Sequence, residues 1–186
     1  DEGDLLIDVK LTTHGDDVVL ITRQGMSIRF HEDDVRRMGR ATTGVRGINL
    51  SDEDEVVAAA VVEKDASLLV AGDRGIGKRT DFEEYRVQSR GGKGIITMKT
   101  GEKTGDVIGA LTVKDGDEIM LITIGGQMVR TSVNYIREIG RNTMGVRLIN
   151  LDEEDRLQAI APVVKEDDDD EDENQLKLDV DINNPD

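Results

Sequence analysis

Basic side chains recur in this sequence at fixed intervals, and arginine above all is suited to bind phosphate. Cations repeated along a curved surface are what a protein needs to bind and bend a nucleic-acid duplex without reading its bases. Ten residues therefore form a predicted phosphate-binding set. They are Arg29, Arg79 and Arg130 at one repeat position, Arg40, Arg90 and Arg141 at a second, Arg46, Lys93 and Arg147 in a third block, and Lys78 beside Arg79.

The same arginines could instead tie neighbouring repeats together by pairing with recurring acidic residues such as Asp33, Glu83 and Glu84. One basic residue per repeat is often used in this way. The complete periodic set argues against that interpretation for all of them, because attraction of a polyanion is a collective effect of many charges.

Other chemistry is poorly supported. Residues 72–79 approach a nucleotide-binding loop, but Arg79 stands where that loop needs a hydroxyl, and the other repeats place a strand there instead of the start of a helix. The chain has no cysteine and two histidines, which excludes thiolate sites and argues against zinc sites and hydrolytic triads. Tyr85 shares an apolar repeat position with Val35 and Ile136 and is predicted to be core. We expect neither a catalytic residue nor a metal site.

Three repeats of about fifty residues must position these cations, and such a period indicates a repeat architecture. The expected repeats are 12–62, 63–113 and 114–164. Each divides into short β-like runs between Gly or Asp turns, which predicts an all-β, propeller-like fold with four-stranded blades. The expected strands include 17–22, 67–71 and 118–124, then 45–50, 94–98 and 146–151, then 56–62, 107–113 and 157–164, with 5–11 as an additional copy of the last kind; 32–38, 81–87 and 133–139 are expected to be loops.

Charge is distributed unevenly along the 186 residues. The formal net charge is -16, yet the windows 23–48, 74–103 and 130–147 each hold more basic than acidic residues. Residues 166–173 are all acidic, so 166–186 is predicted to be a disordered tail that follows the blades, which occupy 1–165.

The lack of cysteine fits a reducing cytoplasm, and no apolar run is long enough to span a membrane. Two Phe, two Tyr and no Trp leave little material for stacking on single-stranded bases.

One segment carries a resemblance to a known family. Gln88, Ser89, Arg90, Gly91, Gly92, Lys93 and Gly94 resemble the GyrA box, whose pattern is Gln, basic, Arg, Gly, Gly, basic, Gly. Flanking residues 77–80, 83–85, 129–131 and 139–146 are similar to the last blades of the DNA gyrase A C-terminal domain. Ser89 replaces a basic residue, and the box lies in the middle repeat, so it resembles the degenerate box of a penultimate blade. Its glycines are expected to let backbone amides approach phosphate.

The resemblance implies the second half of a six-bladed β-pinwheel, about three blades, that wraps duplex DNA and supports negative supercoiling by the holoenzyme. It implies as partners duplex DNA, the rest of gyrase A, and gyrase B, with the chromosome-associated cytoplasm as location and no membrane. ATP, Mg and the DNA-cleaving tyrosine belong to other parts of the resembled holoenzyme, so no cofactor and no catalytic activity are expected here. The alternatives are the related C-terminal domain of topoisomerase IV and a propeller-like protein-interaction scaffold.

Overall fold

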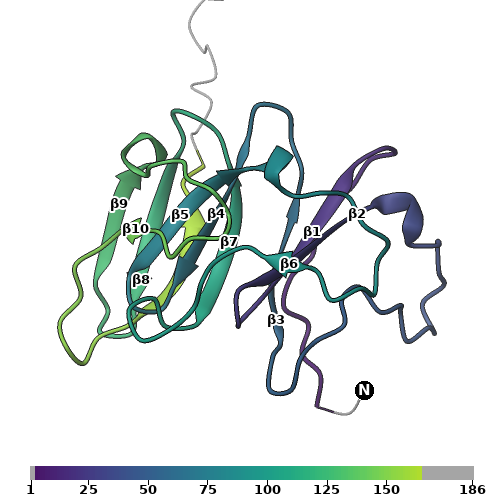
Figure 1. Cartoon of the computed structure of the whole chain (residues 1–186), viewed down its shortest axis with the longest axis horizontal. Helices are drawn as coiled ribbons and strands as arrows, with labels where there is room; N and C mark the ends of the chain where they lie inside the picture. The colour runs from purple at the N-terminus through teal and green to yellow at the C-terminus, as the bar shows by residue number, and fades with distance from the viewer. Residues whose placement is uncertain (1–2, 165–186) are drawn as a thin grey trace, which may run out of the picture.

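The computed structural model of the chain describes residues 3–164, which form three antiparallel sheets that stand side by side in chain order (Figure 1). Each sheet is one blade, built around a tight hairpin. The first contains, in spatial order, β3 (Val56–Val61), β1 (Asp17–Thr22), β2 (Met26–His31) and β6 (Ile95–Ile96). The second contains β10 (Val146–Arg147), β5 (Ile76–Asp81), β4 (Ser67–Gly72) and β7 (Val107–Val113), and the third contains β11 (Leu157–Pro162), β8 (Glu118–Thr123) and β9 (Met128–Ser132).

Short strands cross from one repeat to the blade before it. β6 belongs to the second repeat but pairs with β2 of the first blade, where Ser27 lies opposite Ile95. β10 of the third repeat pairs with β5 of the second blade in the same way, with Gly77 opposite Val146. Each junction between blades is therefore bound by backbone hydrogen bonds as well as by side chains.

The apolar core lies between the blades. All six residues of β4 are buried, because the middle blade has a neighbour on both faces. Leu68 and Val70 enter one core cluster with the first blade, while Leu69 and Ala71 enter a second cluster with the third blade. This alternation follows from the two-residue period of a strand. Strands β3, β7 and β11 form the inner edge of the array, since β7 contacts both of the others.

The predicted all-β, propeller-like fold is confirmed, with four departures in detail. The third blade has three strands instead of the expected four. Residues 5–11 form no strand and are mostly exposed, so that expected strand was wrong. Residues 45–50 form no strand either, whereas their counterparts pair over only two residues each. The expected loops contain short 3-10 helices, η1 (Glu32–Asp34), η2 (Phe82–Glu84) and η3 (Val133–Tyr135). Within residues 3–164 no helix is long and apolar enough to cross a membrane. The expected acidic tail lies outside the described residues.

Candidate nucleic-acid interface

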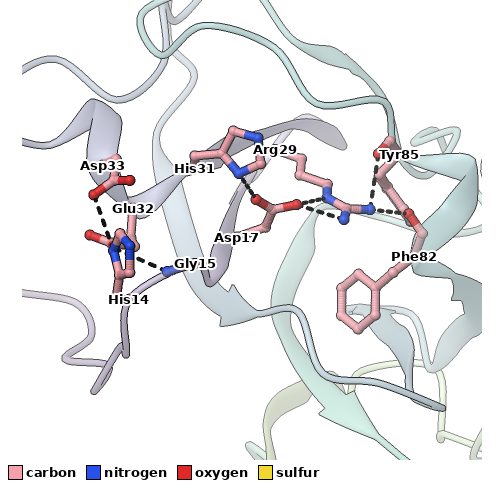
Figure 2. Close-up of polar contacts among 9 residues, drawn as sticks. All are labelled: His14, Gly15, Asp17, Arg29, His31, Glu32, Asp33, Phe82 and Tyr85. Atoms are coloured by element: carbon pink, nitrogen blue, oxygen red, sulfur yellow. Dashed lines mark hydrogen bonds and ion pairs between the residues drawn. The ribbon is translucent and has the colours of Figure 1, made fainter.

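Arg29 and Arg79 occupy equivalent places in β2 and β5, opposite Val19 and Leu69 of their own hairpins. Arg29 donates from Nε to Oδ2 of Asp17 at 2.6 Å, and from Nη1 to the carbonyl oxygens of Phe82 at 2.8 Å and Tyr85 at 3.3 Å (Figure 2). Those two carbonyls belong to the next blade. Arg29 is consequently a connection between blades.

Arg79 repeats this arrangement one blade later. Its Nε donates to the carbonyl oxygen of Ile136 at 2.9 Å, and its Nη1 donates to Oδ1 of Asp115 at 2.6 Å. Only 14% of its side chain is exposed, against 18% for Arg29. We call these two residues the latch arginines. Their position favours the inter-blade interpretation over contact with phosphate.

Lys78 is fully buried, so the prediction that it contacts DNA was wrong. Its Nζ donates to the carbonyl oxygens of Gly140, at 2.7 Å, and Arg141, and to Oγ1 of Thr143 at 3.2 Å. Burial lowers the pKa of Lys78 to about 8, because the charged form loses its hydration. The lysine joins β5 to the third repeat from inside the protein.

Arg130 is the third member of the latch position, but within residues 3–164 no further blade packs against its strand. Its side chain is 57% exposed and pairs with Glu118 of the same hairpin. An equivalent arginine is thus an internal connection where a blade follows it and a surface residue where none does.

The arginines at the second repeat position, Arg40, Arg90 and Arg141, do not share one role. Arg90 donates to the carbonyl oxygens of Asp34 at 2.8 Å and Arg46 at 3.1 Å, and Arg141 donates to that of Ile96 at 2.7 Å. Both are partly buried, and each clamps the connecting segment of the preceding repeat. Arg40, in the first repeat, is exposed.

The box residues pack on the first repeat. The amide of Gln88 donates to the Arg29 carbonyl at 2.8 Å, and the amide of Gly91 donates to the Gly47 carbonyl at 2.6 Å. Gly94 has φ +75°, and a Cβ there would lie 2.2 Å from the Ser27 carbonyl oxygen. The expected phosphate nest is therefore wrong for Gly91, whose amide is already used, and Gly94 is required by close contact with β2. Ser89 and Lys93 are exposed, while Gly92 is partly buried.

Exposed cations do line the connecting segments 35–50, 85–96 and 136–147, which we call the rim segments. Arg46, Lys93 and Arg147 are exposed on them. Lys93 lies two residues before β6 and Arg147 lies in β10, the short edge strands of the first two sheets, whereas Arg46 adjoins no strand. A second exposed column was missed by the sequence analysis: Arg36, Arg86 and Arg137. The signal was present, because each directly follows the repeated apolar position of Val35, Tyr85 and Ile136.

Other chemical groups offer no comparable arrangement among residues 3–164. The stretch that approaches a nucleotide-binding loop forms the turn between β4 and β5 and the first residues of β5, where no helix begins. Tyr85 is buried, as predicted, and its hydroxyl lies 2.6 Å from Oγ1 of Thr97; burial raises its pKa to about 12. His14, Glu32 and Asp33 come together at the surface, where His14 pairs with both carboxylates (Figure 2).

Comparison with known proteins agrees with this geometry. The family model described as the DNA gyrase C-terminal domain, a beta-propeller, matches residues 16–63, 66–114 and 117–163, one match for each blade. The chain belongs to the DNA gyrase C-terminal domain family. The DNA gyrase A polypeptide of Mycolicibacterium smegmatis is 46% identical over 169 residues, which are 90% of this chain and 20% of the relative. That of Escherichia coli is 46% identical over 170 residues, 90% and 19% of the two chains.

Solved structures of related C-terminal domains share the fold of this chain. A DNA gyrase A C-terminal domain superposes with a TM-score of 0.75 at 28% identity, covering 81% of this chain and 51% of that one. The C-terminal domain of DNA topoisomerase IV gives 0.78 at 27%, with 84% and 49% covered. The chain thus spans about half of these domains and about a fifth of the curated gyrase relatives.

Proposed function

We propose that this gyrase C-terminal domain binds duplex DNA without strong sequence preference and bends it along the rim segments. The observation that carries the proposal is that exposed cations recur on all three of these segments. A duplex carries a negative charge about every 1.7 Å of its axis, so a row of cations on successive blades can follow it by neutralising phosphates. Bending requires contacts at several points along the duplex, which a single basic patch would not provide.

The rim cations are distinguished from the remaining basic residues by what holds them. Lys78 and the latch arginines donate to carbonyl and carboxylate oxygens inside the junctions, and a phosphate would have to replace those bonds. Arg86, Lys93 and Arg137 lie on the surface of the rim segments, where binding a phosphate breaks no junction. The proposal therefore assigns DNA contact to the rim and excludes the latch position.

The test is the affinity for a short duplex across a salt series, measured by fluorescence anisotropy. Replacing Arg86, Lys93 and Arg137 by alanine should weaken binding about tenfold or more and lower the log–log salt slope by about 2.7, the value for three lost phosphate contacts. The matched control replaces Lys10, Lys64 and Lys114, three exposed lysines that gather beside the inner edge of the sheets. The proposal fails if both variants lose equal affinity, or if the unaltered chain shows no salt-dependent binding at low salt.

We extend the proposal to the parent enzyme and to the acidic segment. In a gyrase, together with the rest of gyrase A and with gyrase B, this domain would present bent DNA for strand passage and so favour negative supercoiling, with no cofactor or catalytic group of its own. Residues 166–186 would compete with DNA for the rim cations. Removing them should then tighten DNA binding, whereas unchanged affinity would restrict that segment to solubility.

Two alternatives predict different outcomes. A protein-interaction scaffold has no reason to bind phosphate, so absence of salt-dependent DNA binding would favour it. The topoisomerase IV domain shares the fold, but residues 88–94 resemble the gyrase box and favour the gyrase assignment. Supercoiling of relaxed plasmid by a gyrase that carries these blades would separate the two enzymes.

A further inference from the structure

The first rim segment, residues 35–50, is bonded to the repeat that follows it. The Gly47 carbonyl accepts a hydrogen bond from the Gly91 amide at 2.6 Å. The Asn49 amide donates to the Gly92 carbonyl at 2.8 Å. Ordering a segment of this length costs conformational entropy, and contacts from outside the segment offset that cost. The second repeat therefore helps to fix where the cations of the first rim segment stand.

Arg90 of the second repeat holds the same segment at both of its ends. Its Nε donates to the carbonyl oxygen of Asp34, the last residue of η1, at 2.8 Å. Its Nη1 donates to the carbonyl oxygen of Arg46 at 3.1 Å. Because Arg46 is exposed, Arg90 fixes the backbone from which a surface cation projects.

Arg141 makes the corresponding contacts one repeat later, between blades that both lie inside the array. Its Nη1 donates to the carbonyl oxygen of Ile96 at 2.7 Å, and its amide donates to Oε2 of Glu84 at 3.0 Å. Ile96 stands one repeat after Arg46, and Glu84 stands one repeat after Asp34. The two ends of a rim segment are thus held by an equivalent arginine in both cases. We call Arg90 and Arg141 the clamp arginines.

Holding a carbonyl group and binding a phosphate are competing uses of these guanidinium groups. Both clamp arginines are partly buried against the rim segment of the preceding repeat. A phosphate that took the bonded donors of Arg90 would release the carbonyl groups of Asp34 and Arg46. The segment that carries the exposed cations would then lose its support at the moment when it binds.

We propose that the clamp arginines are positioning residues for DNA, which hold the rim cations of the preceding repeat in place and do not themselves contact phosphate. The inference rests on the function proposed above. Cations that are already ordered bind with a smaller entropic cost, so the clamp raises affinity by preorganisation. The number of phosphates neutralised is set by the rim cations and not by the clamp.

Substitutions at Arg90 in the full chain separate positioning from direct contact. Arg90→Lys keeps the charge, but one ammonium group does not reproduce two bonds from different nitrogens of a rigid guanidinium. Arg90→Lys and Arg90→Ala should therefore weaken duplex binding alike, by about fivefold, the scale of one lost ordering contact. Both should leave the log–log salt slope unchanged, whereas Arg46→Ala should lower it by about 0.9. The matched control is Arg74→Lys, an exposed arginine in the turn between β4 and β5, which should bind as the original chain does.

A second measurement needs no DNA. Trypsin cleaves after arginine, and Arg36, Arg37 and Arg40 are exposed in the first rim segment. Loosening the clamp opens this segment locally, so Arg90→Lys should be cut there faster than the original chain, with no change in cleavage elsewhere. Arg74→Lys should be cut as the original chain is. Mass spectrometry of the early fragments identifies the sites.

The outcomes distinguish this inference from the proposed function. An unaltered chain without salt-dependent binding at low salt overturns both. If the chain binds DNA, the clamp role is contradicted by an Arg90→Lys variant that binds normally, or by an Arg90→Ala variant whose salt slope falls as that of Arg46→Ala does. Unchanged cleavage of the first rim segment in Arg90→Lys also contradicts it, whatever the DNA measurements show.

Discussion

Two sets of arginines repeat with the same fifty-residue spacing, and the protein uses them in opposite ways. The latch arginines, Arg29 and Arg79, lie in the middle of strands and donate to carbonyl groups of the next blade. The rim arginines Arg36, Arg86 and Arg137 follow the 3-10 helices and remain exposed. Periodic charge therefore identifies a repeated position in the chain. Whether the arginine there joins two blades or stays exposed to bind a ligand depends on whether the next blade packs against it.

The strongest test of this distinction is Arg29→Ala. Losing the guanidinium removes the hydrogen bonds to Phe82 and Tyr85 and leaves the buried carboxylate of Asp17 without its main partner. Breaking such a pair costs about 3 kcal/mol in the free energy of unfolding. Urea unfolding, followed by circular dichroism, measures it.

Two matched variants separate position from residue type. Arg130→Ala removes an arginine from the same strand position at the open end, and Arg86→Ala removes one from the rim. Both should leave the urea midpoint nearly unchanged. The distinction between latch and rim breaks down if either variant loses as much stability as Arg29→Ala.

A smaller effect should come from the glycines that mark the junctions. Gly94→Ala forces a methyl group against the Ser27 carbonyl, whereas Gly44→Ala adds one to open space at nearly the same positive φ. Both variants bear the backbone strain of a non-glycine residue in this conformation, so the difference between them isolates the contact. We expect Gly94→Ala to be less stable than Gly44→Ala by about 2 kcal/mol, in the range for overpacking. Equal thermal or urea midpoints would show that the box glycine is needed only for its φ.

Much of the blade structure could be predicted from local sequence, because hairpins such as Asp17–Thr22 with Met26–His31 are built from adjacent apolar runs joined by a Gly turn. The short strands could not be predicted with their partners. Ile95 pairs with Ser27, far away in the sequence, and nothing in residues 94–98 shows which blade accepts them. For the same reason 45–50 was expected to be a strand although no described strand accepts it.

In the candidate site, too, the features set by local sequence could be predicted, and those set by a distant partner could not. Exposure of Arg46, Lys93 and Arg147 agrees with their prediction as surface cations, although their contact with DNA stays a prediction. Lys78 was misjudged because a lysine beside an arginine suggests a basic surface, whereas the strand alternation turns it into the junction. The exposed arginines Arg36, Arg86 and Arg137 were missed because each directly follows an apolar position expected to be core, and the sequence does not show that the chain turns outward there.

The smallest expected effect at the junction is the pH dependence of stability that Lys78 confers. In the unfolded chain Lys78 keeps a pKa near its ordinary value of 10.5, while burial lowers its pKa to about 8 in the folded protein. Between these values the unfolded state binds more protons, so the free energy of unfolding should rise with pH, by at most about 1.4 kcal/mol per pH unit. Lys78→Met lacks this gain and also leaves the carbonyls of Gly140 and Arg141 without their donor, which lowers stability by an amount that does not vary with pH.

The informative quantity is therefore the difference in unfolding free energy between the original chain and Lys78→Met, measured from pH 7 to pH 10. Groups common to both proteins cancel in that difference, and the buried Tyr85 does not titrate in this window. Tyr85, with a pKa raised to about 12, begins to affect stability only above the ordinary tyrosine pKa of 10. A difference that grows from pH 8 upward supports a lysine desolvated at the blade junction. A flat difference would mean that Lys78 keeps its ordinary pKa and that water reaches the side chain at the junction.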